Sequence, residues 1–121
     1  GGGDLISMSD CLFCKIAAKD IPSKAVYEDE LVIAIEDINP SAPVHILLIP
    51  RRHITSLNDI STTDESLLGH IQLVAAQIAR EQNIAADGYR LIMNCGSQGG
   101  QEVMHLHYHL LGGREMLWPP G

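Results

Sequence analysis

The chain is short of basic residues and of long apolar segments. Among its 121 residues, 8 Lys and Arg stand against 15 Asp and Glu, so the formal net charge at pH 7 is -7. An acidic chain without a lysine or arginine cluster gives no support for binding to nucleic acid or to membranes. No apolar run approaches the roughly 18 residues of a transmembrane helix, and no signal-peptide core follows Met8. A phosphate ligand would therefore have to be held by histidines and backbone N–H groups.

Cysteine is also scarce, and three cysteines are an odd number that argues against a disulfide framework. Two of them form Cys11-x-x-Cys14, so we expect a cytoplasmic protein with a metal site or a redox pair. Aromatic residues make up 4% of the chain, but the hydrophobic content of 45% is enough for one core. Residues 1–7, GGGDLIS, resemble a tag remnant, so we expect a single domain at 8–121.

Apolar periodicity predicts an α+β fold with a largely antiparallel sheet. A short helix is expected at 12–18, and apolar runs predict strands at residues 25–28, 31–36, 45–49, 89–94 and 104–111. The strongest helix signal runs from Thr62 to about Gln82. There, Thr62-x-x-Glu65 forms a capping box, and the apolar residues that follow form one stripe. The order of the elements places this helix on one face of the sheet.

Three histidines, His105, His107 and His109, alternate with apolar residues near the C-terminus. In an extended strand their side chains would share one face. Such a face could bind a metal, perform nucleophilic and acid–base chemistry on phosphorus, or simply face solvent. A solvent face more often carries Thr, Lys or Glu. The glycine-rich loop at 96–100 could form a nest of N–H groups for an anion, which favours a phosphate beside the imidazoles.

The segment at 99–111, GGQEVMHLHYHLL, resembles the signature of the histidine-triad (HIT) family, His-φ-His-φ-His-φ-φ with φ hydrophobic. The similarity covers nearly all of residues 11–121 and includes DINP (37–40), APVH (42–45), IPRRH (49–53), DESLLGH (64–70) and GGR (112–114). The terminal WPPG resembles the Hint branch, the purine nucleoside phosphoramidases, in a bacterial-type member. The resemblance implies a HIT-like fold: a mainly antiparallel five-stranded sheet with one long and one short helix.

The resemblance also implies an enzyme that hydrolyses the P–N bond of purine nucleoside phosphoramidates. These are AMP- or GMP-linked amines, such as aminoacyl-lysine adenylates. His107 would attack phosphorus and carry the nucleotide covalently, which splits one difficult displacement into two. His109 would bind the phosphate and assist proton transfer, and no catalytic cofactor is implied. His45 matches a further histidine beside the triad, although a core histidine at the start of a buried strand would give the same pattern.

Nucleotide-binding residues follow from the same resemblance. Asp37 would accept hydrogen bonds from the ribose hydroxyls, a role that competes with a simple turn aspartate. The base and phosphate contacts would come from Ile38, Phe13, Ile16, Ile21, Ile35, Asn94, Gly100, Gln101 and Val103. The apolar members are equally readable as core. Glu102 departs from the serine of eukaryotic relatives; it would repel phosphate, so we assign it no phosphate contact, and it could instead meet the ammonium of an amine leaving group.

The resemblance also implies a zinc site and a homodimer. Several prokaryotic HIT proteins bind zinc through two cysteines and two histidines, which here are Cys11, Cys14, His53 and His105. The alternative is a pair of buried thiols and two ordinary histidines.

In the Hint homodimer, two five-stranded sheets join into one of ten strands across a two-fold axis, and Trp118 would reach the partner's site.

Two other functions stay open at this stage. A binding module would hold a purine nucleotide and regulate a partner protein, but the intact His45, His107 and His109 favour catalysis. A dinucleoside polyphosphate hydrolase is the second alternative, and the WPPG tail argues against it. The sequence leaves open the physiological amine, the pathway and the preference between adenine and guanine.

Overall fold

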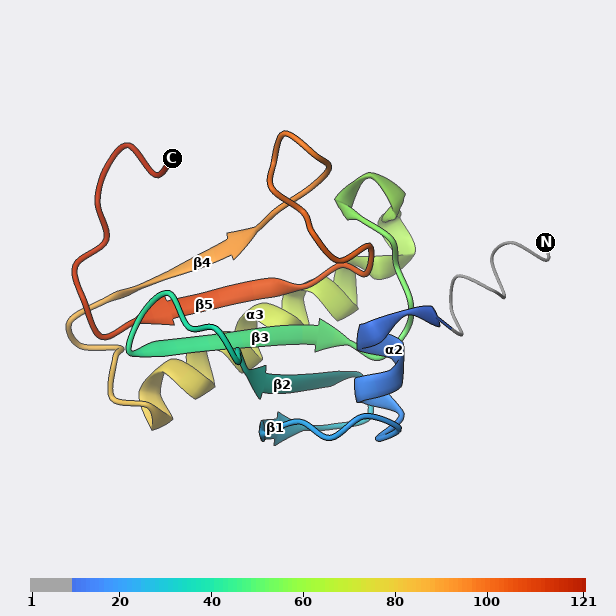
Figure 1. Cartoon of the computed structure of the whole chain (residues 1–121), viewed down its shortest axis with the longest axis horizontal. Coiled ribbons are helices and arrows are strands. Elements are labelled where there is room, and N and C mark those ends of the chain that lie inside the picture. The colour runs from blue at the N-terminus through green and yellow to red at the C-terminus, as the bar shows by residue number, and fades with distance from the viewer. Residues whose placement is uncertain (1–9) are drawn as a thin grey trace.

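Five antiparallel strands form one sheet in the order β1-β2-β3-β5-β4 (Figure 1). The computed structural model describes residues 10–121, and the expected tag remnant at 1–7 lies outside the described residues. The strands are β1 (Ala25–Glu28), β2 (Val32–Glu36), β3 (Val44–Pro50), β4 (Tyr89–Met93) and β5 (Tyr108–Gly112). The α+β class and the number of strands agree with the sequence prediction. No helix in residues 10–121 is long and apolar enough to span a membrane.

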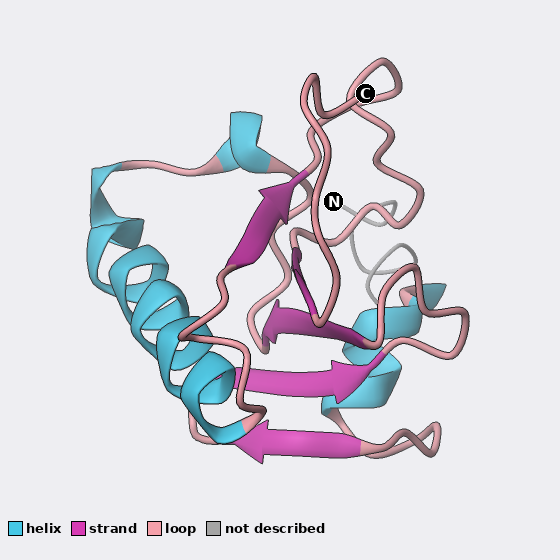
Figure 2. Ribbon diagram, turned by 90° about the vertical axis from the view of Figure 1, so that its left-hand side faces the viewer, coloured by secondary structure: helices cyan, strands magenta, loops and turns pink. Residues whose placement is uncertain are grey.

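Helices cover both faces of the sheet, as Figure 2 shows. The long helix α3 (Glu65–Glu81) packs on one face, and the short helix α2 (Leu12–Ala17) packs on the other. Along β2, Val32 and Ala34 belong to the core under α3, whereas Ile33 and Ile35 belong to the core under α2. Because both faces are buried, β2 and β3 read as nearly continuous apolar runs instead of alternating ones.

The long helix begins later than the sequence predicted. Residues Thr62–Asp64 form a 3-10 helix, and α3 starts at Glu65. The capping box lies one residue earlier than expected, because the Asp64 carboxylate accepts a hydrogen bond from the Ser61 N–H at 2.9 Å. The expected pair of Thr62 and Glu65 was therefore wrong by one position. Ser and Thr are both good capping residues, so composition alone did not separate the two registers.

The histidine strand is shorter than predicted, since β5 starts at Tyr108 and not at Met104. Pro50 supplies the reason. Arg51 donates its N–H to Leu31 O on the β2 side, so the backbone groups of Pro50 point toward β5. Proline has no N–H to continue that ladder, and Pro50 O accepts a hydrogen bond from the His105 ring at 2.8 Å. The expectation that one strand carries all three histidines is thus wrong, and Met104 is half exposed and not part of the core.

Hydrogen bonds of Asp29 connect the β1–β2 turn to α3. One carboxylate oxygen of Asp29 lies 2.6 Å from both Tyr27 Oη and His70 Nε2. The other oxygen accepts the N–H groups of Leu31 and Val32. Partial burial opposes ionisation, but these hydrogen bonds outweigh it and hold the pKa of Asp29 well below its ordinary value.

We expect Asp29→Asn to lower the free energy of unfolding by roughly 1–3 kcal/mol at pH 7, because it weakens hydrogen bonds to a charged acceptor. A depressed carboxyl pKa stabilises the fold above the unfolded value near 4 and loses that effect as pH falls toward the folded value. The difference from wild type in urea unfolding should therefore be full at pH 7 and shrink below about pH 4. Asp20→Asn, in an exposed loop, is the control. A difference that stays constant from pH 7 to pH 3 would contradict this account.

Candidate active site

A cavity of about 750 Å³ opens on the sheet face that carries α2. Its size suits a small-molecule ligand. Its wall comes from α2, the ends of β2 and β3, the start of β5 and the loop before β5. Most of the expected site residues line it: His45, His107, His109, Phe13, Ile16, Ile21, Ile35, Asp37, Ile38, Asn94, Gly100 and Val103. Phe13, Ile16 and Ile35 also belong to the core, so both interpretations hold for them, whereas Ile38 is 92% exposed and is not a core residue.

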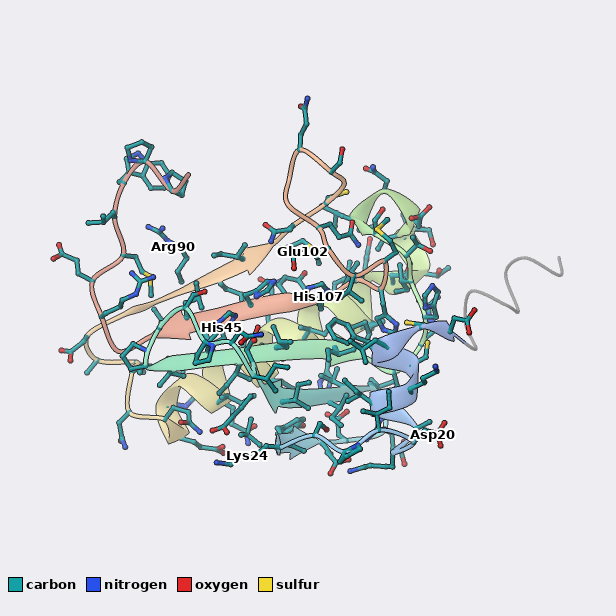
Figure 3. All side chains as sticks on the ribbon, in the orientation of Figure 1. Asp20, Lys24, His45, Arg90, Glu102 and His107 are labelled. Carbon is teal, nitrogen blue, oxygen red and sulfur yellow. The ribbon has the colours of Figure 1, made fainter. Side chains whose placement is uncertain are left out.

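Sheet register places two histidines side by side. Leu47 pairs with His109 across β3 and β5, and His45 pairs with Leu111, so His45 and His109 are diagonal neighbours on one face. Their ring centroids are 5.2 Å apart. His107 directly precedes β5, and its ring lies 5.0 Å from that of His109. The three rings form one row along the cavity wall, and Figure 3 labels His45 and His107 in this row.

Hydrogen bonds fix the proton positions on two of these rings. The backbone N–H of Ser41 donates to His45 Nδ1 at 3.0 Å, so neutral His45 carries its proton on Nε2. The His45 Nε2–H donates to His109 Nδ1 at 2.9 Å. An oxygen of Asp37 lies 3.4 Å from His45 Nε2. Neutral His109 must then carry its proton on Nε2. The row therefore ends in a hydrogen-bond donor on His109.

His107 is arranged in the opposite sense and offers an acceptor. Its Nδ1 donates to the carbonyl oxygen of His105 at 2.8 Å, which leaves a lone pair on Nε2. The edge of Phe13 packs against the ring, with centroids 4.9 Å apart and planes at 87°. A neutral imidazole with a free and oriented Nε2 is the form that attacks phosphorus.

Burial keeps these imidazoles neutral near pH 7. It lowers the pKa of His45 despite the neighbouring charge of Asp37. It also lowers the pKa of His107 despite the hydrogen bond to His105. For His109, burial, followed by repulsion from His107 and His45, lowers the pKa to about 4. A neutral His107 can attack without first losing a proton, and a neutral His109 still has one N–H to donate.

A metal at the triad was one of the possibilities that the sequence left open. Ligand-type atoms of Asp37, His45 and His109 do lie within 4.8 Å of one another. The nitrogens of His45 and His109 that face each other are joined by a hydrogen bond, however, so neither lone pair is free for a shared ion. This geometry favours proton transfer over metal binding.

The glycine-rich loop is held by Gln101, which does not line the cavity. The side-chain oxygen of Gln101 accepts the Gly96 N–H at 3.0 Å, and its side-chain nitrogen donates to Thr55 O at 2.8 Å. A side chain at Gly99 would collide with Cys95 O, and Gly100 has a φ of +83°. The sequence placed Gln101 among the nucleotide contacts. That contact stays a prediction; in this structure the side chain of Gln101 holds the loop that borders the cavity.

Trp118 also lies outside the cavity of its own chain. Its side chain is 82% exposed, with the Arg90 guanidinium 5.9 Å from the ring centroid. Arg90 also donates a hydrogen bond to Leu117 O at 2.9 Å. The expected contact of Trp118 with a nucleotide involved the partner's cavity, so it stays a prediction.

Several cavity residues escaped the sequence analysis. Lys24 and Glu36 lie in the wall and form an ion pair of 3.0 Å. Ser41 orients His45 through a backbone N–H, which every residue except proline carries, so no residue type signals this role. Glu102, for which the sequence analysis suggested a contact with an amine leaving group and none with phosphate, also lines the wall.

A second cluster lies at the N-terminus of α2 and unites Cys11, Cys14, His53 and His105, as the sequence predicted. Ligand-type atoms of the four residues lie within 4.8 Å of one another. Three sulfur–nitrogen distances are 3.2, 3.4 and 3.5 Å, and the two Nδ1 atoms are 3.2 Å apart. Around zinc, tetrahedral ligand atoms would be separated by about 3.3 Å for two nitrogens and about 3.6 Å for sulfur and nitrogen.

The surroundings of this cluster also suit a cation. His105 Nε2 donates to Pro50 O, so its Nδ1 faces the cluster with a lone pair. Burial and the neighbouring Cys11 thiol raise the pKa of Cys14 to about 11. A Cys14 thiolate would therefore be stable here only beside a strong positive charge, which argues against a reactive redox pair. The donor set and its spacing fit zinc.

Comparisons with known proteins agree with this geometry. A family model described as HIT domain matches residues 18–116. A purine nucleoside phosphoramidase of Escherichia coli is 53% identical over 107 residues, which cover 88% of this chain and 90% of the relative. The crystal structure of a HIT family hydrolase from Legionella pneumophila superposes with a TM-score of 0.92 at 50% identity, covering 93% and 100% of the two chains. A zinc-bound histidine triad protein from Mycobacterium smegmatis superposes with a TM-score of 0.76 at 32% identity, covering 88% and 77%.

Proposed function

Because the chain belongs to the HIT domain family, we propose that it is a hydrolase that cleaves the P–N bond of purine nucleoside phosphoramidates. Its substrates would be AMP- or GMP-linked amines, including aminoacyl-lysine adenylates. The observation that carries the proposal is the pairing of a free His107 Nε2 with an N–H donor on His109 at one cavity wall. A purely regulatory nucleotide-binding module would have no need of an oriented nucleophile.

In the first step, the lone pair of His107 Nε2 attacks phosphorus while the P–N bond to the amine breaks. The nucleotide is then bonded to His107, and the amine departs after accepting a proton from His109 Nε2. Until the next step His109 lacks this proton, and the hydrogen bond from His45 Nε2–H to its Nδ1 stabilises the ring in that form. The bond from His107 Nδ1–H to His105 O spreads the positive charge that develops on the attacking ring.

In the second step, water attacks phosphorus and the bond to His107 breaks. His109, which lost its proton to the amine, accepts one from the attacking water. The nucleoside monophosphate leaves, and both imidazoles return to their starting protonation states. The ribose would lie beside Asp37 and the base beside Ile38, Phe13 and Ile21, all of which line the cavity.

We expect His107→Ala to lower turnover of a fluorogenic adenosine phosphoramidate by roughly a thousandfold or more, as for other nucleophile knockouts. AMP binding, measured by calorimetry, should persist because the rest of the cavity is unchanged. Rapid quench of the wild type should trap a nucleotide on His107.

Near wild-type turnover in His107→Ala would rule out the covalent mechanism. Wild-type protein that binds AMP but turns over no phosphoramidate would support the regulatory binding module instead. A preference for dinucleoside polyphosphates over phosphoramidates would favour the other hydrolase.

We also propose that Cys11, Cys14, His53 and His105 hold a structural zinc ion. Four protein ligands leave no open position, so the ion would stabilise the fold and take no part in the reaction at phosphorus. It would connect the start of α2 to the segment after β3 and to the residues before β5. The three free cysteines fit a reducing compartment such as the cytoplasm.

Protein purified without chelator should contain about one zinc per chain by elemental analysis. Cys14→Ser should lose the zinc and lower the melting temperature by about 5 °C or more, because it removes a ligand. Cys95→Ser, which changes the cysteine outside the cluster, should do neither. A zinc content near zero in zinc-supplied wild type, with an unchanged melting temperature in Cys14→Ser, would exclude the site.

A homodimer is the third part of the proposal. β4 is an edge strand that pairs only with β5 among the described residues, so a second copy could extend the sheet. Leu73 on α3 is 71% exposed, and Leu117 and Trp118 project from the tail. Large exposed apolar side chains on so small a protein favour a self-association surface.

Sedimentation equilibrium should show a dimer at micromolar concentration. Leu73→Glu should weaken it by about tenfold or more, since a two-fold interface contains the substitution twice. Leu31→Glu, which changes an exposed leucine in the β1–β2 turn, is the matched control. A wild-type monomer at micromolar concentration would refute the dimer.

A further inference from the structure

The cavity that would receive an anionic phosphate is itself acidic. Its wall contains three carboxylates, Glu36, Asp37 and Glu102, and a single ammonium, Lys24. The histidines aside, the wall thus has an excess of two negative charges. A ligand with only negative charge would be repelled by this wall. A ligand that also carries a positive charge would be attracted by it.

Two of the three carboxylates already have partners. Glu36 pairs with Lys24 at 3.0 Å. Asp37 lies 3.4 Å from His45 Nε2 and accepts the Asn39 N–H at 2.8 Å. Glu102 has neither a hydrogen bond nor an ion pair with any other residue in 10–121, and it is exposed to solvent. Of the three carboxylates in this wall, Glu102 is therefore the one whose charge is free to pair with a cationic ligand.

The position of Glu102 relative to the reacting histidine is set by its neighbours in the chain. Gln101 anchors the preceding position through Gly96 and Thr55, and it also donates to Val103 O at 3.1 Å. All four of Glu102, His107, His45 and Lys24 line the same cavity, and in Figure 3 Glu102 is drawn on the His107 side and Lys24 at the lower edge, below His45. The unpaired Glu102 therefore lies on the His107 side of the cavity, whereas Glu36 lies with its partner Lys24.

We propose that Glu102 is a specificity-determining residue that favours phosphoramidates whose amine part carries a second, positively charged group, such as the free ammonium of a diamine or a lysine side chain. This inference rests on the proposed function, because the amine leaves from the phosphorus that His107 attacks. Glu102 makes no bond in the reaction. Its carboxylate pairs with the distal ammonium of the leaving group and offsets the repulsion between the acidic wall and the phosphate.

The test compares two adenosine 5′-phosphoramidates of equal chain length, one with a 4-aminobutyl group and one with a pentyl group. The two compounds differ only at the end of the chain, where the first has an ammonium group and the second a methyl group. Wild type should favour the aminobutyl compound in kcat/KM by roughly threefold to tenfold, the range of a partly exposed charge pair. The preference should shrink as sodium chloride is raised, because salt screens exposed charges.

Glu102→Gln should bring the ratio of the two kcat/KM values to about one, and Glu102→Lys should reverse the preference. Glu30→Gln removes one negative charge from the exposed β1–β2 turn and serves as the matched control; it should keep the wild-type ratio. A ratio that falls equally in Glu30→Gln and Glu102→Gln would assign the effect to net charge and overturn the proposal. The proposal would also be overturned if both compounds are cleaved and the ratio of their kcat/KM values is the same in wild type and in Glu102→Gln.

If neither compound is cleaved, the proposed function fails, and the role of Glu102 is decided by binding alone. Calorimetry on wild type and Glu102→Gln should then show tighter binding of the aminobutyl compound only in wild type. Equal affinities of the two compounds for wild type would overturn the inference.

Discussion

The hydrogen bond from the His105 ring to Pro50 O determines how the histidine-rich segment is divided. Proline offers no N–H toward β5, so the ladder ends at the pair of Leu48 and Tyr108. The residues before Tyr108 are then free of the sheet, and the oxygen of Pro50 accepts a side chain in place of a backbone N–H. His105 is thereby drawn to the cysteine cluster, while His107 and His109 face the cavity. One missing backbone donor thus allows adjacent histidines to serve two different sites.

The polar cavity and the apolar core share the same face of the sheet, and this arrangement gives the histidines their properties. Ile33, Ile35 and Leu47 pack with α2 beside the cavity, so the imidazoles of β3 and β5 lie in a largely dry environment. Dryness lowers their pKa values and raises the energetic cost of any unsatisfied nitrogen. Each ring nitrogen inside the row has a partner as a result, and no buried side-chain polar atom among the described residues is left without one. In the row, the nitrogens without a protein partner in residues 10–121 are Nε2 of His107 and Nε2 of His109, two residues that line the cavity.

Much of this arrangement could be predicted from the sequence. Apolar periodicity located all five strands and both helices, and the spacing of the histidines, together with family resemblance, pointed to most of the residues that line the cavity and to the four of the cysteine–histidine cluster. The errors came from interactions with distant residues. Alternation at 104–111 indicated one strand, because the pattern carries no information about the proline on the neighbouring strand. The capping box was misplaced by one residue, since Ser61 and Thr62 are both good capping residues, and α3 begins only at Glu65 because Thr62–Asp64 form a 3-10 helix. The role of the Ser41 N–H and the inward turn of Gln101 depend on loop conformation, which residue types do not specify.

Phe13 separates the two histidine sites and contacts both. Its ring lies 4.9 Å from that of His107 and 5.9 Å from that of His105, nearly perpendicular to the first. With Nδ1 bound to a carbonyl and one side against this aromatic edge, the His107 imidazole has almost no rotation left to lose. In the proposed reaction, the entropic cost of aligning this ring is therefore met when the chain folds and not when substrate binds. The packing of α2 and the orientation of the His107 ring therefore depend on the same contact, that of Phe13 with His107.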